Sequence, residues 1–204
     1  MNSEILNRFL SEYQLPMQYD LEWFSKKMDY LRPCIRKYWE AADYVKIPFE
    51  RDSEVHGKAH CKRVLTLSIL LGFLQAVPQK DLDSLATAAI YHDVGRLSDM
   101  EEWIHGQISA EKYELAVQNP DPMAAFLMTY HSCDDTEGEA AAAEMDDPNR
   151  ALQLLKIFKD ADALDRIRFG LGDLDPSFLR LDESKKLICA SIYLFVGSQT
   201  ELNY

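Results

Sequence analysis

Residues 55–77 read VHGKAHCKRVLTLSILLGFLQAV, and from Val64 onward this stretch carries no charged side chain. Its apolar run, residues 64–77, spans 14 residues, whereas a helix needs about 20 apolar residues to cross a bilayer. The run therefore predicts a helix buried in the core of a globular protein. His60 shares a helical face with Val64 and Leu67, four and seven residues further on. Its imidazole is expected to point inward, either as a hydrogen-bonded core residue or as a metal ligand.

Helical periodicity continues through most of the chain, and no alternating strand pattern interrupts it. The stretch GEAAAAEMDD at 138–147 is either a surface turn or a short helix. We therefore expect an all-α, single-domain helical bundle, with residues 1–45 as an N-terminal helical layer on a core formed by residues 46–204. Proline and glycine residues separate the predicted helices, which lie near residues 2–12, 20–43, 57–76, 81–93, 106–118, 121–132, 148–168 and 183–196.

Charge and cysteine content restrict the classes of partner. The chain has 204 residues, with 22 Lys+Arg against 34 Asp+Glu and a net charge of −12. Binding to long nucleic acids or to anionic membranes is not expected, because contacts with many phosphates need a basic face. The four cysteines are scattered without a CxxC pair, and the first residues lack a secretory pattern. These features predict a cytoplasmic protein with reduced cysteines, and they do not indicate an oligomeric state.

The dipeptide His92–Asp93 is the second candidate for metal chemistry. Leu85, Ala88 and Ala89 lie on the helical face of His92, so this imidazole also points inward. The helix is expected to end at Gly95, which leaves room for both side chains to approach one ion. An inward carboxylate is costly to bury without a cation or a strong hydrogen-bond donor.

The segment KDADALDRIR, residues 159–168, contains three aspartates on different faces of one predicted helix. At about 100° per residue, Asp162 and Asp165 fall within the apolar arc, whereas Asp160 falls on the opposite, solvated face. We therefore expect Asp160 to be an exposed charge and the other two to be buried carboxylates. Imidazole and carboxylate ligands without thiolate suit Mn, Fe, Co, Ni or Zn, with Mg possible.

The order of these motifs resembles the HD-domain superfamily of metal-dependent phosphohydrolases over about residues 50–196. The resemblance implies a helical HD-type core and the metal ligands His60, His92, Asp93 and Asp162. His105 and His131 match the extra histidines of two-metal members, in which Asp93 would bridge the ions; alternatively they orient substrate or cap helices. The matching motifs are HGxxHxxRV at 56–64, HDxGR at 92–96, HGxxSA at 105–110, ADALDRIR at 161–168 and SFLRLDESKKLI at 177–188.

Residues near these motifs have expected roles around the metal, that of His56 on the resemblance alone. Asp93, His56 and Arg96 are the expected catalytic residues, with His56 as a substrate contact or a general acid. Each basic residue has an alternative role in a surface salt bridge. The residues expected to contact the substrate are Arg63, Lys159, Arg166 and Asp165.

The predicted function is metal-dependent hydrolysis of a nucleotide or a similar small phosphate ester. One or two divalent ions would lower the pKa of bound water from about 15.7 towards about 7. The sequence does not distinguish a phosphomonoesterase from a phosphodiesterase. Two alternatives stay open: a di-iron oxygenase on the same scaffold, and a catalytically silent module that binds nucleotides.

Overall fold

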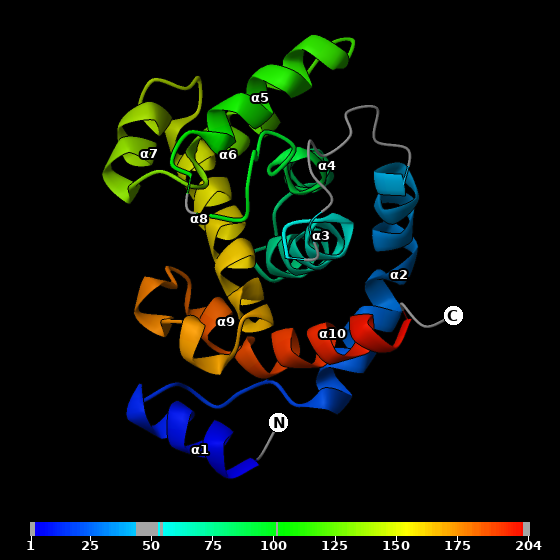
Figure 1. Ribbon diagram of the computed structural model, residues 1–204, viewed down its shortest axis with the longest axis vertical. Helices are drawn as coiled ribbons and strands as arrows, with labels where there is room; N and C mark the ends of the chain where they lie inside the picture. The colour runs from blue at the N-terminus through cyan, green and yellow to red at the C-terminus, as the bar shows by residue number, and fades with distance from the viewer. Residues whose placement is uncertain (1–2, 44–52, 54, 101, 202–204) are drawn as a thin grey trace.

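The computed structural model describes residues 3–43, 53, 55–100 and 102–201. Helices make up all the regular structure in these residues, which confirms the expected all-α fold (Figure 1). Three short 3-10 helices follow α8: η1 (Asp165–Arg168), η2 (Leu171–Asp173) and η3 (Pro176–Phe178). The α-helices are α1 (Ser3–Glu12), α2 (Leu21–Asp43), α3 (Lys58–Leu74), α4 (Gln79–Tyr91), α5 (His105–Ala116), α6 (Pro122–Tyr130), α7 (Asp135–Ala142), α8 (Pro148–Leu164), α9 (Asp182–Lys185) and α10 (Ile188–Glu201).

Helix α3 is the centre of the bundle. The side chains on all of its faces are buried, and Leu65, Leu67 and Ile69 are fully so, as expected for a helix that is apolar all round. Helices α2, α4 and α8 pack around it. A Cβ at Gly72 would lie only 2.6 Å from Leu82 Cδ2, so this glycine permits the close approach of α3 and α4.

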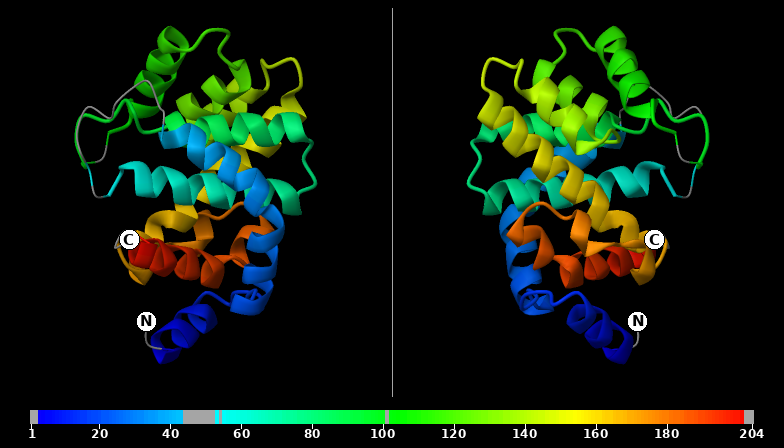
Figure 2. Two further views of the ribbon diagram at one scale, coloured as in Figure 1. Left: turned by 90° about the vertical axis from the view of Figure 1, so that its right-hand side faces the viewer. Right: turned by 90° about the vertical axis from the view of Figure 1, so that its left-hand side faces the viewer.

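The N-terminal segment covers one end of the bundle. Helix α2 packs on α3 and α10 and buries Phe24, Leu31 and Ile35. Helix α1 has no buried residue and lies at the end of the molecule away from α5 and α7 (Figures 1 and 2). The linker after α1 is held to the C-terminal part by a hydrogen bond from Tyr19 N to Lys186 O at 3.0 Å. The expected boundary between residues 45 and 46 lies outside the described residues.

Two further expectations can be compared with the structure. The segment 138–147 begins inside α7, whose first turn is capped by the Asp134 side chain accepting from Thr136 N. All four cysteines are free thiols.

Within the described part of the chain, no helix combines the length and apolarity needed to cross a membrane.

Candidate metal centre

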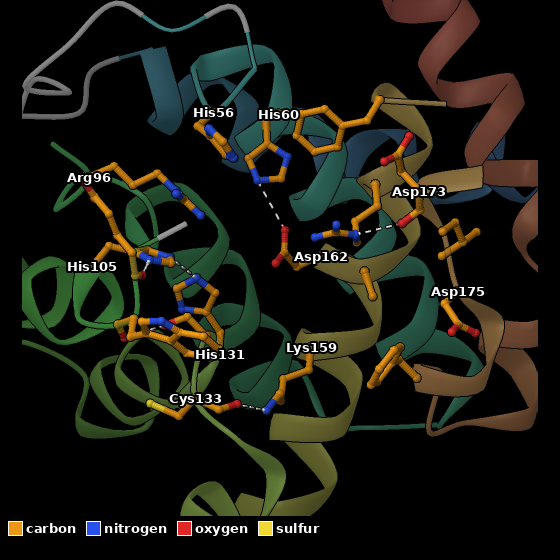
Figure 3. A pocket seen from close by; sticks show the side chains of 18 of the residues that line it. His56, His60, Arg96, His105, His131, Cys133, Lys159, Asp162, Asp173 and Asp175 are labelled. Carbon is orange, nitrogen blue, oxygen red and sulfur yellow. Dashed lines mark hydrogen bonds and ion pairs between the residues drawn. The ribbon is translucent and has the colours of Figure 1, made fainter. Parts of the chain in front are cut away.

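The predicted ligands come from five helices and converge at their ends. His60 lies in the first turn of α3, His105 begins α5, and His131 follows α6. His92 and Asp93 follow the last turn of α4, and Asp162 lies in the last turn of α8. Figure 3 shows the labelled side chains of His60, His105, His131 and Asp162 around one common space. Ligands at helix ends can approach one another because the backbone there turns away from the bundle axis.

Glycine and serine position the loop after α4 against α5. A Cβ at Gly95 would lie 2.6 Å from both His105 O and Ser109 N. The Gly95 N–H instead donates to Ser109 Oγ at 2.9 Å. Because only a glycine fits this contact, Gly95 brings the segment carrying Asp93 next to the start of α5, where His105 lies.

Four of the histidines are oriented in the same way, with Nδ1 bound to an oxygen outside the cluster. His92 Nδ1 donates to Ala89 O at 3.0 Å, and His131 Nδ1 donates to Met128 O at 2.7 Å. His105 Nδ1 donates to Glu102 O, and His60 Nδ1 binds Asp165 Oδ2 at 2.7 Å. Carbonyl oxygens only accept, so the proton of each neutral ring is on Nδ1 and the Nε2 lone pair is directed into the cluster.

The Nε2 atoms form two pairs, one on each oxygen of Asp93. His60 Nε2 and His92 Nε2 are 3.1 Å apart and lie 3.4 and 3.5 Å from Asp93 Oδ2. His105 Nε2 and His131 Nε2 are 2.9 Å apart and lie 3.3 and 3.9 Å from Asp93 Oδ1. Each histidine pair with Asp93 is a buried group that could hold a metal ion. Asp93 is thus shared by the two groups.

The chemistry of this donor set fits divalent cations. Two Nε2 atoms at hydrogen-bond distance must share either a proton or a metal cation, because two facing lone pairs would repel. Asp93 Oδ2 is buried without a hydrogen-bond partner in the described structure, and such an oxygen is costly to bury. Burial alone would raise the pKa of the Asp93 carboxyl, but His92, His105 and His60 hold it well below its usual range. Asp93 is therefore an ionised carboxylate ready to bind a metal.

Asp162 lies where the group formed by His60, His92 and Asp93 meets the cavity. Its Oδ1 is 3.3 Å from His60 Nε2, and its side chain is 30% exposed. Burial lowers the pKa of His60 and Arg168 adds to this effect, but the nearby carboxylates of Asp162, Asp165 and Asp93 outweigh both and raise the pKa of His60 to about 10. A metal ion at the first group would replace this proton, because a histidine ligand binds in its neutral form.

Asp165 and Arg63 differ from the sequence expectation, because neither lines the cavity. Both are buried behind His60, where Arg63 Nε donates to Asp165 Oδ1 at 2.7 Å and Arg63 Nη2 to Oδ2 at 3.0 Å. The other contact of Asp165 Oδ2 is His60 Nδ1. Asp165 therefore orients a candidate ligand through a buried ion pair, and the structure places neither of these two predicted substrate residues at the cavity.

Asp160 was expected on the solvated face of α8, and this prediction is wrong. Its exposed fraction is 0%. Its Oδ2 accepts from Arg180 N and Leu181 N, both at 2.9 Å. The segment between η3 and α9 covers this face of the helix, so the carboxylate caps that segment instead of meeting solvent.

A cavity of about 850 Å³ opens above the candidate metal groups. Of the predicted substrate and catalytic residues, His56, Arg96, Lys159 and Arg166 line it. Figure 3 shows the first three around the cavity. Arg96 Nε donates to Asp93 Oδ1 at 2.9 Å, and His56 Nδ1 contacts Asp99 Oδ1 at 3.0 Å.

The other two cavity cations are bound to backbone oxygens. Lys159 Nζ donates to Cys133 O at 2.7 Å, and Arg166 Nε donates to Asp173 O at 3.0 Å (Figure 3). Sequence reasoning missed two further arginines in the lining, Arg168 and Arg180. Both lie inside motifs that carried the resemblance, which is the signal that could have found them.

Comparison with known protein families identifies the class. The family model described as HD domain matches residues 58–167, more than half of the chain, and this span contains every predicted metal ligand. Neither curated proteins nor solved structures give a significant match. The chain belongs to the HD-domain family, whose members are mostly metal-dependent phosphohydrolases.

Proposed function

We propose that this protein is a metal-dependent phosphohydrolase that acts on a small phosphate ester, with a nucleotide as the leading substrate class. The observation that carries the proposal is the pair of histidine groups joined by Asp93 at the floor of a cavity whose lining carries both basic and acidic side chains. When bound there, divalent ions supply Lewis acidity to a phosphoryl oxygen and make a bound water acidic at neutral pH. The residues expected to hold them are His60, His92, Asp93, His105, His131 and Asp162.

The charge balance of the site supports an anionic substrate. Three carboxylates surround the floor of the cavity, and three guanidiniums lie beside them, so their formal charges cancel. With neutral histidines, each divalent ion would add two positive charges to this balanced set, although the outer lining carries further acidic side chains such as Asp99 and Asp135. A phosphate ester dianion would neutralise one such ion. The groups counted are Asp93, Asp162 and Asp165 against Arg63, Arg96 and Arg168.

Arg96 and His56 have separate roles in this proposal. Arg96 holds the Asp93 carboxylate through Nε and reaches Met100 O through Nη1 at 3.3 Å, so it fixes the shared ligand. Burial lowers the pKa of His56, and Asp99 only partly reverses that shift. A neutral His56 that donates Nδ1–H to Asp99 has Nε2 free to accept a proton or a hydrogen bond from substrate or water. This favours a proton acceptor over the general acid suggested by the sequence.

The size and lining of the cavity favour a substrate with an aromatic or apolar part. Pockets for small ligands are commonly about 300–1,000 Å³, and this cavity of about 850 Å³ lies within that range. Trp103, Phe169 and Phe178 line it and are 67, 44 and 67% exposed. Exposed aromatic rings beside a phosphate site provide surfaces on which a base can stack.

The test is a substrate screen with matched variants. Phosphomonoesters, cyclic nucleotides and dinucleotides are assayed with Mn²⁺, Co²⁺, Ni²⁺ or Mg²⁺, and bound metal is measured by elemental analysis. Asp93→Ala and Asp162→Ala are expected to lose turnover with the helical circular dichroism spectrum intact. Asp29→Ala, whose side chain is 69% exposed on α2, is the control. Unchanged turnover in both cavity variants contradicts the proposal, and bound iron with oxygen uptake but no hydrolysis replaces it with the di-iron oxygenase alternative.

A further inference from the structure

Arg168 is a buried cation at the cavity, and two of its three nitrogen atoms make no hydrogen bond in the described structure. Its side chain is 7% exposed and lines the cavity. Within the described residues, its Nε and Nη1 atoms are buried without a hydrogen-bond partner. A buried donor that makes no hydrogen bond keeps the full cost of its desolvation, and this cost is larger when the donor is charged. The folded protein therefore carries an unfavourable feature at the site itself.

Neutralising Asp165 does not explain this guanidinium. Arg168 Nη1 is 3.6 Å from Asp165 Oδ2, too far for a hydrogen bond. Asp165 is already bound by Arg63 through two hydrogen bonds at 2.7 and 3.0 Å and by His60 at 2.7 Å. With these three donors on its two oxygens, Asp165 needs no second arginine. Arg168 is thus not required to neutralise the Asp165 carboxylate behind His60.

The surroundings hold Arg168 beside the candidate metal groups. The Phe169 ring centroid lies 4.3 Å from its Cζ, so the aromatic ring covers one face of the guanidinium. Burial lowers the pKa of Arg168, even though Asp162, Asp165 and Asp93 act to raise it. The three carboxylates therefore compensate its charge only in part. Each of the other cavity cations considered above donates to a protein oxygen: Arg96, Lys159, Arg166 and Arg180.

We propose that Arg168 binds the phosphoryl oxygens of the substrate. It supplies the cationic contact that the sequence had assigned to Arg63, through the part of the guanidinium that lines the cavity. The inference rests on the proposed function, because it takes the anion to be the phosphoryl group of a substrate. It concerns binding only, so it is tested without turnover.

The experiment titrates inorganic phosphate into the Mn²⁺-loaded full-length protein by isothermal calorimetry. Arg168→Gln is expected to weaken phosphate binding at least tenfold with the bound metal unchanged, and Arg168→Lys to recover part of the affinity. Arg32→Gln is the control, because Arg32 is 71% exposed on α2 and pairs with Asp29, three residues away on the same helix. Equal phosphate affinity in the wild type and Arg168→Gln overturns the inference. Parallel loss of metal and phosphate also overturns it, because that pattern assigns Arg168 a structural role.

A measurement on the wild-type protein covers the case in which the variants do not fold. The Nε–H resonance of Arg168 is followed by NMR with a diamagnetic ion, Zn²⁺ or Mg²⁺, while inorganic phosphate is added. A saturable shift of that resonance supports the inference; a resonance that stays unmoved, or phosphate that does not bind, overturns it. A protein that binds phosphate through Arg168 but hydrolyses no ester contradicts the proposed function alone.

Discussion

Asp165→Asn tests how the protein holds His60 in place. The carboxylate is 1% exposed and accepts from His60 Nδ1 and twice from Arg63. An asparagine has one oxygen to offer these donors, and its amide group would face at least one of them. Arg63 would then be a buried cation without its carboxylate, and breaking a buried ion pair in this way costs about 3–5 kcal/mol.

The cost can be converted into two measurable changes. In a chain of this length, each kcal/mol lowers the melting temperature by about 2–4 °C, so we expect a loss of roughly 6–20 °C in the metal-free protein. Removing the partner that orients a histidine ligand weakens metal binding by about 10–100-fold. At a metal concentration 1,000 times the wild-type Kd, the stabilisation by metal would then fall from about 4.1 to about 1.4 kcal/mol for a 100-fold loss.

The assay is thermal unfolding by circular dichroism in EDTA and again with excess Mn²⁺, together with calorimetry of Mn²⁺ binding. Asp29→Asn is the matched control, because its side chain is 69% exposed and surface changes usually stay within about 0.5 kcal/mol. A metal-free melting temperature within about 2 °C of wild type, with Mn²⁺ affinity within about twofold, would refute the role assigned to Asp165.

Three further outcomes follow from the same geometry. Removing metal from the wild-type protein with EDTA is expected to lower its melting temperature by about 5–10 °C, compared with the same protein at a metal concentration of 100 times Kd. The reason is that Asp93 Oδ2 and the facing Nε2 atoms lose their cation. Re-added Mn²⁺ should restore it, and a melting temperature that responds to neither treatment contradicts the metal centre. Asp160→Ala is expected to cost about 2–4 kcal/mol in urea unfolding, since Arg180 N and Leu181 N lose their acceptor; a change below about 0.5 kcal/mol would mean that this carboxylate is solvated after all. His56→Gln is expected to reduce turnover by about 10²–10⁴-fold and to leave bound metal unchanged, because His56 belongs to neither histidine group; wild-type turnover would remove it from the catalytic residues.

Several features of this protein could be predicted from local sequence. The run VLTLSILLGFLQAV predicts a buried α3, and the positions of His60 and His92 on apolar helical faces predict inward imidazoles; the structure has both. Helical periodicity is a local property of the chain, so it determines which face of each helix is buried. The order of histidines and aspartates then indicates the family, because metal ligands must recur at particular places along such helices.

Other features were decided by the tertiary structure. A helical pattern gives the direction of a side chain around its own axis, but not which distant segment covers it. Asp160 is buried because a segment about twenty residues further along the chain folds over α8. Arg63 pairs with Asp165, 102 residues away, and is thereby withdrawn from the cavity that Arg168 lines. The partner of a buried charge depends on long-range packing. The sequence by itself therefore determined the all-α class and the candidate ligands, although it joined α9 and α10 into one helix and left α7 open. The fold decided which charges neutralise one another and which face the cavity.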